Sequence, residues 1–194
     1  MDNLTFTCSD ALDQPVTPGC TTDYGERIVR IALMKTSDDT TWAGSDYSAA
    51  SDYSTAAEFV IGIASDYITI INGISNGHRI EIGATTLSGD DTITGGEERF
   101  DVQYRVEGRI KVLNETVARA TEKLDRYSQL RLWYFTDKNY CFGGAEGYRV
   151  SPNFGLKIFE GQGQPAYIPF QCDFTAIGAD YAHYDADYAS LTNS

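Results

Sequence analysis

Histidine is scarce in this chain of 194 residues, and its cysteines are not paired in motifs. The two histidines, His78 and His183, are far apart in the sequence, and neither has a partner at metal-ligand spacing. No two cysteines form a CxxC pair, which argues against a zinc site or a thioredoxin-type motif. Nucleophile-elbow, HExxH and Walker-type motifs are also missing. We therefore expect no enzymatic activity, no catalytic or metal-binding residue and no cofactor.

Long hydrophobic runs are missing as well. A membrane helix needs about 18 or more consecutive apolar residues, and no such run exists, so no membrane span is expected. The first residues lack the basic and apolar regions of a signal peptide. In the reducing cytosol that this implies, the cysteines are expected to be thiols, and a bridge between Cys8 and Cys20 stays open as a minor alternative.

Positive charge is in short supply. The chain has 15 Lys and Arg against 28 Asp and Glu, which gives a net charge of -13. This balance argues against a general electrostatic affinity for nucleic acid, which needs basic surfaces. The simplest interpretation of the negative charge is solubility, and the alternative is a surface that repels DNA passing along it.

Aromatic residues and glycines are plentiful, with 13 Tyr, 9 Phe and 18 Gly, a composition that favours β-structure with many turns. The length suits one domain. We expect an extended N-terminal arm over residues 1–25, a single β-rich domain over 26–176 with a long loop insertion at 36–57, and a loose C-terminal tail over 177–194.

Several short strands are predicted along the chain. The segment 27–35 is apolar at almost every position, which predicts a strand buried on both faces. Further strands are predicted at 58–64, 67–72 and 78–83, with turns at the two Asn-Gly pairs between the last two. A hairpin is predicted from 130–135 to 140–142, and a last strand pair from 156–159 to 167–174.

The clearest pattern is a strict alternation of apolar and polar residues from Phe100 to Val112, typical of a half-buried strand. Gly108 falls on the apolar face and predicts a bend or bulge. The polar face either lies in solvent, lines a lumen or contacts another subunit. Its members are Asp101, Gln103, Arg105, Glu107, Arg109 and Lys111.

A helix is predicted next, over about residues 114–126, with Asn114 as its N-cap and one apolar stripe. The elements together predict a mainly-β fold, a β-sandwich or partly open barrel with this one flanking helix. The 36–57 segment is rich in Ser, Asp, Thr and Ala, so we expect it to be a surface loop. Its Trp42, Tyr47 and Tyr53 are candidate contacts to a neighbouring subunit, and a mobile loop is the alternative.

The order of elements resembles a known family. A long alternating strand, a single helix, the 132–142 hairpin with an acidic turn, a Gly-rich stretch, then 155–159 and 166–174 follow one another. This order resembles small virion structural proteins of tailed bacteriophages, those of crAss-like phages in particular, and is similar to the tail-tube and neck-ring fold family. In that family a β-sandwich with one packed helix forms stacked rings. The order carries the resemblance, and no motif of fixed residues does.

The resemblance implies a non-enzymatic virion subunit, made in the host cytoplasm, that forms a ring or tube around a DNA-conducting channel. Its partners would be copies of itself and other tail or neck proteins, and DNA would pass without specific binding. Two other functions stay open. One is a capsid decoration or head-fibre protein, and the other is a carbohydrate-binding adhesin module.

Overall fold

The computed structural model describes residues 27–35, 55–88, 97–112, 115–127, 129–144, 146–159, 161, 165–176 and 182–192. The strands are β1 Ile28–Lys35, β2 Ile68–Ser88, β3 Glu97–Lys111, β4 Leu130–Thr136, β5 Tyr140–Phe142, β6 Tyr148–Phe154, β7 Tyr167–Ala176 and β8 Ala182–Tyr184. The helices are α2 Ala56–Ala64, α3 Glu115–Leu124 and a short 3-10 helix, η3 Ala186–Ser190.

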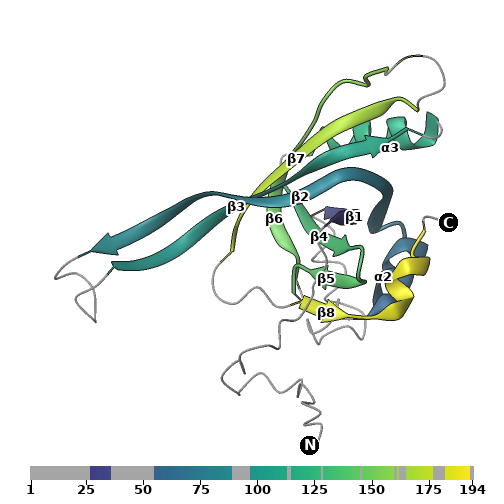
Figure 1. Cartoon of the computed structure of the whole chain (residues 1–194). Coiled ribbons are helices and arrows are strands. Elements are labelled where there is room, and N and C mark those ends of the chain that lie inside the picture. Colours follow the sequence, from purple (N-terminus) through teal and green to yellow (C-terminus); the bar gives the residue numbers. More distant parts are fainter. Residues whose placement is uncertain are drawn as a thin grey trace, which may run out of the picture.

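Six of these strands close into an antiparallel barrel (Figure 1). Their order is β1-β2-β3-β7-β6-β4, and β4 pairs back onto β1. The strands β5 and β8 continue the sheet outward from β4. The expected mainly-β fold is confirmed, with the barrel fully closed and with two short α-helices in place of one.

Strands β1 and β4 are buried on both faces, as the apolar sequence at 27–35 predicts. One face points into the barrel, where Leu33 and Leu132 join its main core. The opposite face carries Met34, Trp133 and Phe135, which belong to a second core outside the barrel. A strand covered on both sides cannot alternate apolar and polar residues, because neither face meets water.

The second core is covered by α2 and by the C-terminal segment. Phe59 of α2 makes edge-on ring contacts with Trp133 and Phe135, at centroid distances of 5.8 and 5.1 Å. Tyr188 of η3 makes edge-on ring contacts with two members of this cluster, Phe59 at 6.0 Å and Phe135 at 5.0 Å. Edge-to-face aromatic contacts of this kind add to the gain from burial.

The helix α2 replaces the strand predicted at 58–64, and that prediction is wrong. Ala56, Phe59 and Ile63 are buried at the spacing of one helix face, and Thr55 and Glu58 form a capping box at its start. The backbone N–H of Thr55 donates to Glu58 at 3.0 Å. The boundary of the predicted loop at 57 is also wrong, since residues 55–57 belong to the start of this helix.

The two strands predicted at 67–72 and 78–83 form one 21-residue strand, β2. The Asn-Gly pairs do not turn the chain, because Gly73 and Asn76 adopt positive φ values of 75° and 54° within the strand. The register with β3 shifts between Ser75 and His78, so β2 has one more residue than β3 in this interval, as at a β-bulge. Beyond the barrel, β2 and β3 continue together as a two-stranded ribbon (Figure 1).

The alternation predicted for 100–112 is confirmed where side chains are described. Val106 and Ile110 of β3 are fully buried, whereas Gln103 and Arg109 are exposed. The β3–β7 register is unbroken at Gly108, whereas the β2–β3 register shifts between the pairs Ser75–Arg109 and His78–Glu107, so the irregularity expected at this glycine lies in its pairing with β2. Gly108 allows β3 and β2 to approach closely, since a Cβ at this position would lie 3.0 Å from the Cα of Gly77.

The helix α3 lies within the range predicted for it, and the proposed N-cap Asn114 is outside the described residues. Ala118, Thr121 and Leu124 form its buried face. Just beyond the helix, the Asp125 carboxylate accepts a hydrogen bond from the backbone N–H of Phe154 at 3.1 Å, which links this segment to β6.

The C-terminal segment is not the loose tail predicted for 177–194, at least over residues 182–192. Strand β8 pairs with β5, and Tyr188 and Leu191 are buried in the second core. Arg30 donates hydrogen bonds to the carbonyl oxygens of Tyr188 and Ala189. A polar composition hid this packing, because only two large apolar side chains of the segment face inward.

The predicted hairpin from 130–135 to 140–142 is confirmed as β4 and β5. The predicted pair of 156–159 with 167–174 is wrong as a ladder, since Ile158 makes a single bridge to Tyr167. Strand β7 pairs along its length with β3 and in part with β6. Cys141 and Cys172 are buried thiols, as expected, and Cys8 and Cys20 lie outside the described residues.

Candidate functional site

The predicted polar face of β3 lies in a larger surface on the outside of the barrel, which we call the outer face. It is built from rows of side chains that cross β2, β3, β7 and β6, because residues opposite one another in a ladder point to the same side. One row runs from Ile80 through Arg105 and Asp173 to Ser151. The next row contains His78, Glu107, Gln171 and Asn153.

An ion pair joins the two central strands of the outer face. The Arg105 Nε donates to Asp173 Oδ1 at 2.6 Å, and its Nη2 donates to Asp173 Oδ2 at 2.8 Å. This two-point contact lowers the pKa of the Asp173 carboxyl, chiefly through the hydrogen bond from Arg105. Hydrogen bonding to the carboxylate likewise raises the pKa of Arg105. The pair fixes the side chains at the middle of this surface.

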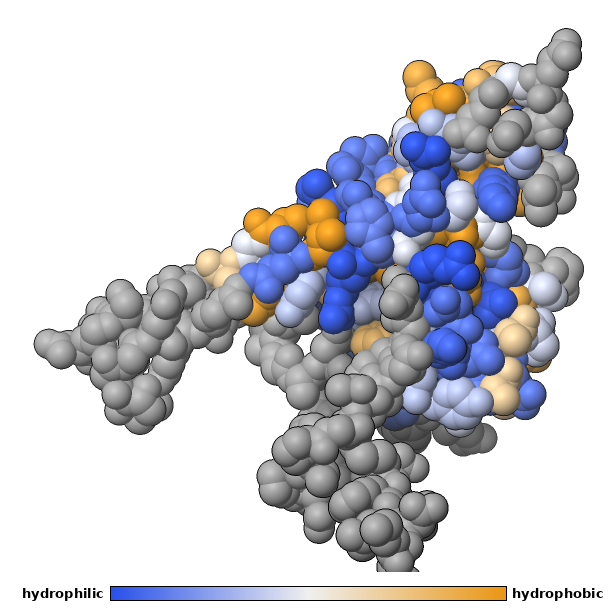
Figure 2. All heavy atoms as spheres, in the orientation of Figure 1, coloured by the Kyte–Doolittle hydropathy of each residue, from blue (hydrophilic) through white to orange (hydrophobic). Residues whose placement is uncertain are grey.

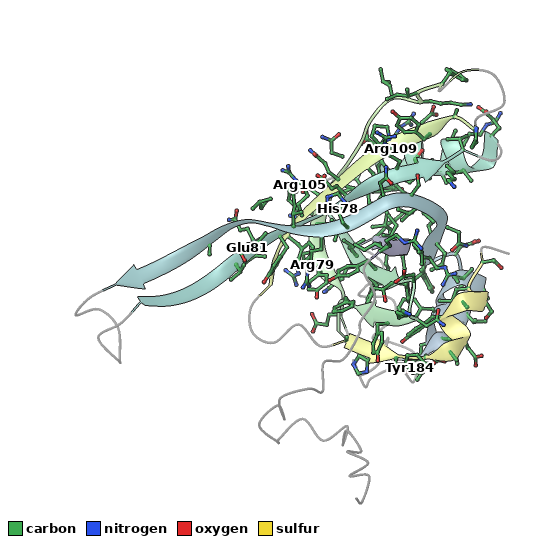
Figure 3. All side chains as sticks on the ribbon, viewed as in Figure 1. His78, Arg79, Glu81, Arg105, Arg109 and Tyr184 are labelled. Atoms are coloured by element: carbon green, nitrogen blue, oxygen red, sulfur yellow. The ribbon has the colours of Figure 1, made fainter. Side chains whose placement is uncertain are left out.

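A second polar contact lies one row away. His78 Nε2 is 3.3 Å from Glu107 Oε1, and His78 Nδ1 is 2.9 Å from the carbonyl oxygen of Asn76. Figure 3 shows His78, Arg105 and Arg109 along the same side of the β2–β3 pair. Both imidazole nitrogens are thus directed at groups of the same chain, and the arrangement positions the ring rather than presenting a nucleophile–base pair.

Two shallow hollows indent the outer face. The larger, about 510 Å³, is lined by polar side chains over a floor that includes Gly108 and Phe170. The second, about 450 Å³, lies along the ribbon side and is lined in part by Ile82, Gln103 and Thr175. The hollows lie on either side of the row of side chains that contains Arg105, so together they follow the direction of β3.

The structure brings most of the predicted face together and leaves other predicted residues undescribed. Gln103, Arg105, Glu107, Arg109 and Lys111 all lie on the outer face with solvent access. The backbone of Asp101 belongs to β3, and its side chain is not described. The three aromatic candidates of the long loop fall outside the described residues, namely Trp42, Tyr47 and Tyr53.

The opposite side of the β2–β3 pair carries a cation over an aromatic cluster, which the sequence analysis missed. The Arg79 guanidinium lies 4.8 Å from the ring centroid of Tyr104 and donates to the Tyr134 hydroxyl at 2.7 Å. Burial raises the pKa of Tyr134 to about 12. Tyr134 stacks on Phe142 at 4.9 Å, so Arg79 covers one end of the barrel core (Figure 3).

Large apolar side chains are also exposed at sites that sequence reasoning missed. Ile80 and Ile82 lie on β2 beyond the last residue that pairs with β1, with 37% and 40% of their surfaces exposed. Leu156 and Phe159, in the segment after β6, are 88% and 77% exposed. Figure 2 shows apolar groups on the ribbon within a largely hydrophilic face. For Ile80 and Ile82, the alternation with polar residues in β2 was the sequence signal that could have identified the exposed side chains.

More than half of the acidic residues have side chains that the structure does not describe. The described side chains include fourteen Lys and Arg and twelve Asp and Glu, so this part of the chain is close to neutral. The remaining sixteen acidic residues fall mainly in residues 1–26, 36–54 and 89–101. On the outer face, Arg105, Arg109 and Lys111 outnumber Glu107 and Asp173.

Within the described part of the chain, no group of three or more His, Cys, Asp or Glu side chains is placed to hold a metal ion. The described helices are all too short or too polar to cross a membrane. Comparison with family models, with curated proteins and with solved structures gives no match.

Proposed function

We propose that this chain is a non-enzymatic structural subunit that joins copies of itself into a ring or tube in a phage virion. The proposal follows the resemblance in element order described above. In this proposal the assembly encloses a channel through which DNA passes, and other tail or neck proteins bind its ends. The subunit contributes shape and contacts rather than chemistry.

The observation that carries the proposal is the β2–β3 ribbon. Among the described strands, only β3 pairs with β2 beyond Gly77, so no second described strand pairs with β2 along the ribbon. A strand edge of this kind is a template for pairing with another chain. Ile80 and Ile82 expose apolar surface there, which a single copy in water does not bury.

The charge of the outer face bears on which surface would line a channel. A lumen that lets DNA pass should repel the phosphate backbone. The described part of this face presents Arg109 and Lys111, which attract phosphate, while Arg105 is paired with Asp173. Of the two roles in an assembly expected for the face, beside simple exposure to solvent, this balance supports a contact between subunits over the lining of a lumen.

Electron microscopy of the purified protein tests the proposal. We expect rings or tubes at high protein concentration, and a chain that stays strictly monomeric under these conditions would contradict the proposal. A variant with Ile80→Asp and Ile82→Asp should lose the assemblies, because two charges would have to be buried at the contact. Its unfolding midpoint should match that of the unmodified chain, since both side chains are exposed.

A matched control replaces exposed apolar residues elsewhere. Val60→Asp with Ile61→Asp places the same charges on the exposed side of α2. This variant should still assemble. If both double variants lose the rings equally, net charge rather than the ribbon governs association, and the assigned role of the ribbon is wrong.

A further inference from the structure

Acidic and basic residues are distributed unevenly along this chain. Residues 1–26 contain five acidic residues and no Lys or Arg. The outer face carries an excess of basic groups among its described side chains, with Arg109 and Lys111 on neighbouring outward positions of β3. Complementary charge of this kind steers association and sets which surfaces meet.

The shape of the outer face suits an extended peptide. Its two hollows follow β3, and their linings include the apolar side chains of Pro169 and Ile82. Residues 1–26 also contain scattered apolar side chains, among them Leu4, Phe6 and Leu12. Alternate side chains of an extended segment could enter the hollows while its carboxylates meet the basic groups on the rims.

We propose that residues 1–26 of one copy bind along the outer face of another copy. This inference rests on the proposed assembly and names the contact that holds it. A stretch of 26 residues spans up to about 90 Å when extended, against a radius of gyration of about 16 Å for a compact chain of this length. Residues 36–54 are joined to described elements at both ends, β1 and α2, which limits their reach. These two features favour the N-terminal segment as the occupant.

Disulfide trapping between two versions of the full-length chain tests the contact. The donor keeps Cys8 and carries Cys20→Ser. The acceptor carries Gln171→Cys together with Cys8→Ser and Cys20→Ser. Cys141 and Cys172 are buried in both versions and should not react. A donor–acceptor disulfide under mild oxidation can then form only between copies, and a size tag on the acceptor identifies it by electrophoresis.

A matched acceptor carries Glu122→Cys in place of Gln171→Cys, on an exposed position of α3. We expect trapping at position 171 to be about tenfold faster than at 122. Adding Arg109→Glu and Lys111→Glu to the acceptor should reduce the rate at 171 by about tenfold. High salt should reduce it as well, because screening weakens contacts between exposed charges.

Four outcomes would overturn the inference. Equal trapping at 171 and 122 would mean that the segment does not select the outer face. Trapping found only when both cysteines are in one chain would mean that it binds its own barrel. Unchanged trapping in the Arg109→Glu, Lys111→Glu variant, with loss of binding to a DNA duplex, would make the face a nucleic-acid surface. Rings seen by microscopy without trapping would reject this contact and leave the proposed function standing.

Discussion

The Asp185 carboxylate accepts a hydrogen bond from the backbone N–H of Ala56 at 2.8 Å, across 129 positions of sequence. Its other oxygen accepts from the backbone N–H of Asp187 at 2.9 Å. One side chain thus serves the first turn of α2 and caps η3. This carboxylate joins the two elements that cover the second core, and it explains how a polar C-terminal segment becomes part of the fold.

Replacement of Asp185 by alanine should therefore destabilise the protein. Loss of a capping side chain costs about 0.5–2 kcal/mol, and here two helix starts lose their acceptor, so we expect about 2 kcal/mol. Urea unfolding followed by tryptophan fluorescence measures the change, because Trp133 lies in the second core. Asp187→Ala is the control, since its exposed side chain should change stability by less than about 0.5 kcal/mol. Equal effects of the two substitutions would show that Asp185 does not hold the two helices.

Two tyrosines of the C-terminal segment offer a matched pair. Tyr188 is fully buried among Phe59 and Phe135, whereas Tyr184 is 61% exposed. Tyr188→Ala should destabilise the fold by about 3–5 kcal/mol, as other large-to-small changes of buried aromatic residues do. Tyr184→Ala should cost about 1 kcal/mol or less, because it loses only a partial ring contact with Tyr140. Thermal or urea unfolding distinguishes these values. Similar losses at both positions would mean that the segment does not pack as described.

The glycine at 108 is expected to tolerate no side chain. A Cβ there would lie 3.0 Å from Ile74 Cγ2 and 3.1 Å from Phe170 Cε1, so Gly108→Ala forces core atoms apart. We expect a loss of about 1–3 kcal/mol in the free energy of unfolding. The control is Gly83→Ala in β2, where a Cβ would lie 3.7 Å from Gln103 Oε1, an ordinary contact. That substitution should be neutral or slightly stabilising, and a loss of equal size at both glycines would argue against a tight contact at 108.

The elements that the sequence predicted correctly are those whose burial can be read from their own residues. In β3 the change from Arg105 to Val106 to Glu107 follows the two sides of a single sheet, and the prediction was confirmed. The sequence also predicted β1, because nearly every residue there is apolar. In both segments the local pattern and the final burial agree.

The errors arose where burial depends on distant residues. Phe59 and Ile63 lie in a short apolar run that fits either a strand or a helix, and the Thr55–Glu58 capping signal was the clue that would have identified α2. Tyr188 is buried because Arg30 and Asn72 bind the segment around it, and because Asp185 of that segment binds the start of α2. No local pattern reveals contacts between residues more than a hundred positions apart. The rows of the outer face likewise depend on strand order, which the sequence did not provide.

The ion pair on the outer face should make stability depend on pH in the acid range. Arg105 lowers the pKa of Asp173 in the folded state from its ordinary value of 3.8, chiefly through its hydrogen bond, and the unfolded chain lacks this contact. The unfolded state therefore binds its proton at a higher pH. The stabilisation is complete above the unfolded pKa and is lost as the pH falls through the lower folded pKa. Asp173→Asn should thus be less stable than the unmodified chain at pH 7, and this difference should shrink below about pH 4.

Urea unfolding of both chains across this pH range measures the difference, and added salt should reduce it at pH 7, because the pair is partly exposed. The control places Asp173→Asn in an Arg105→Gln background, where the carboxylate has lost its donor. There the substitution should leave the dependence of stability on pH unchanged between pH 7 and pH 4. A persistent difference in that background would assign the effect to some other neighbour of Asp173. The ion pair would then be a feature of the surface without a measurable role in folding, and the centre of the outer face would be less rigid than the two hydrogen bonds imply.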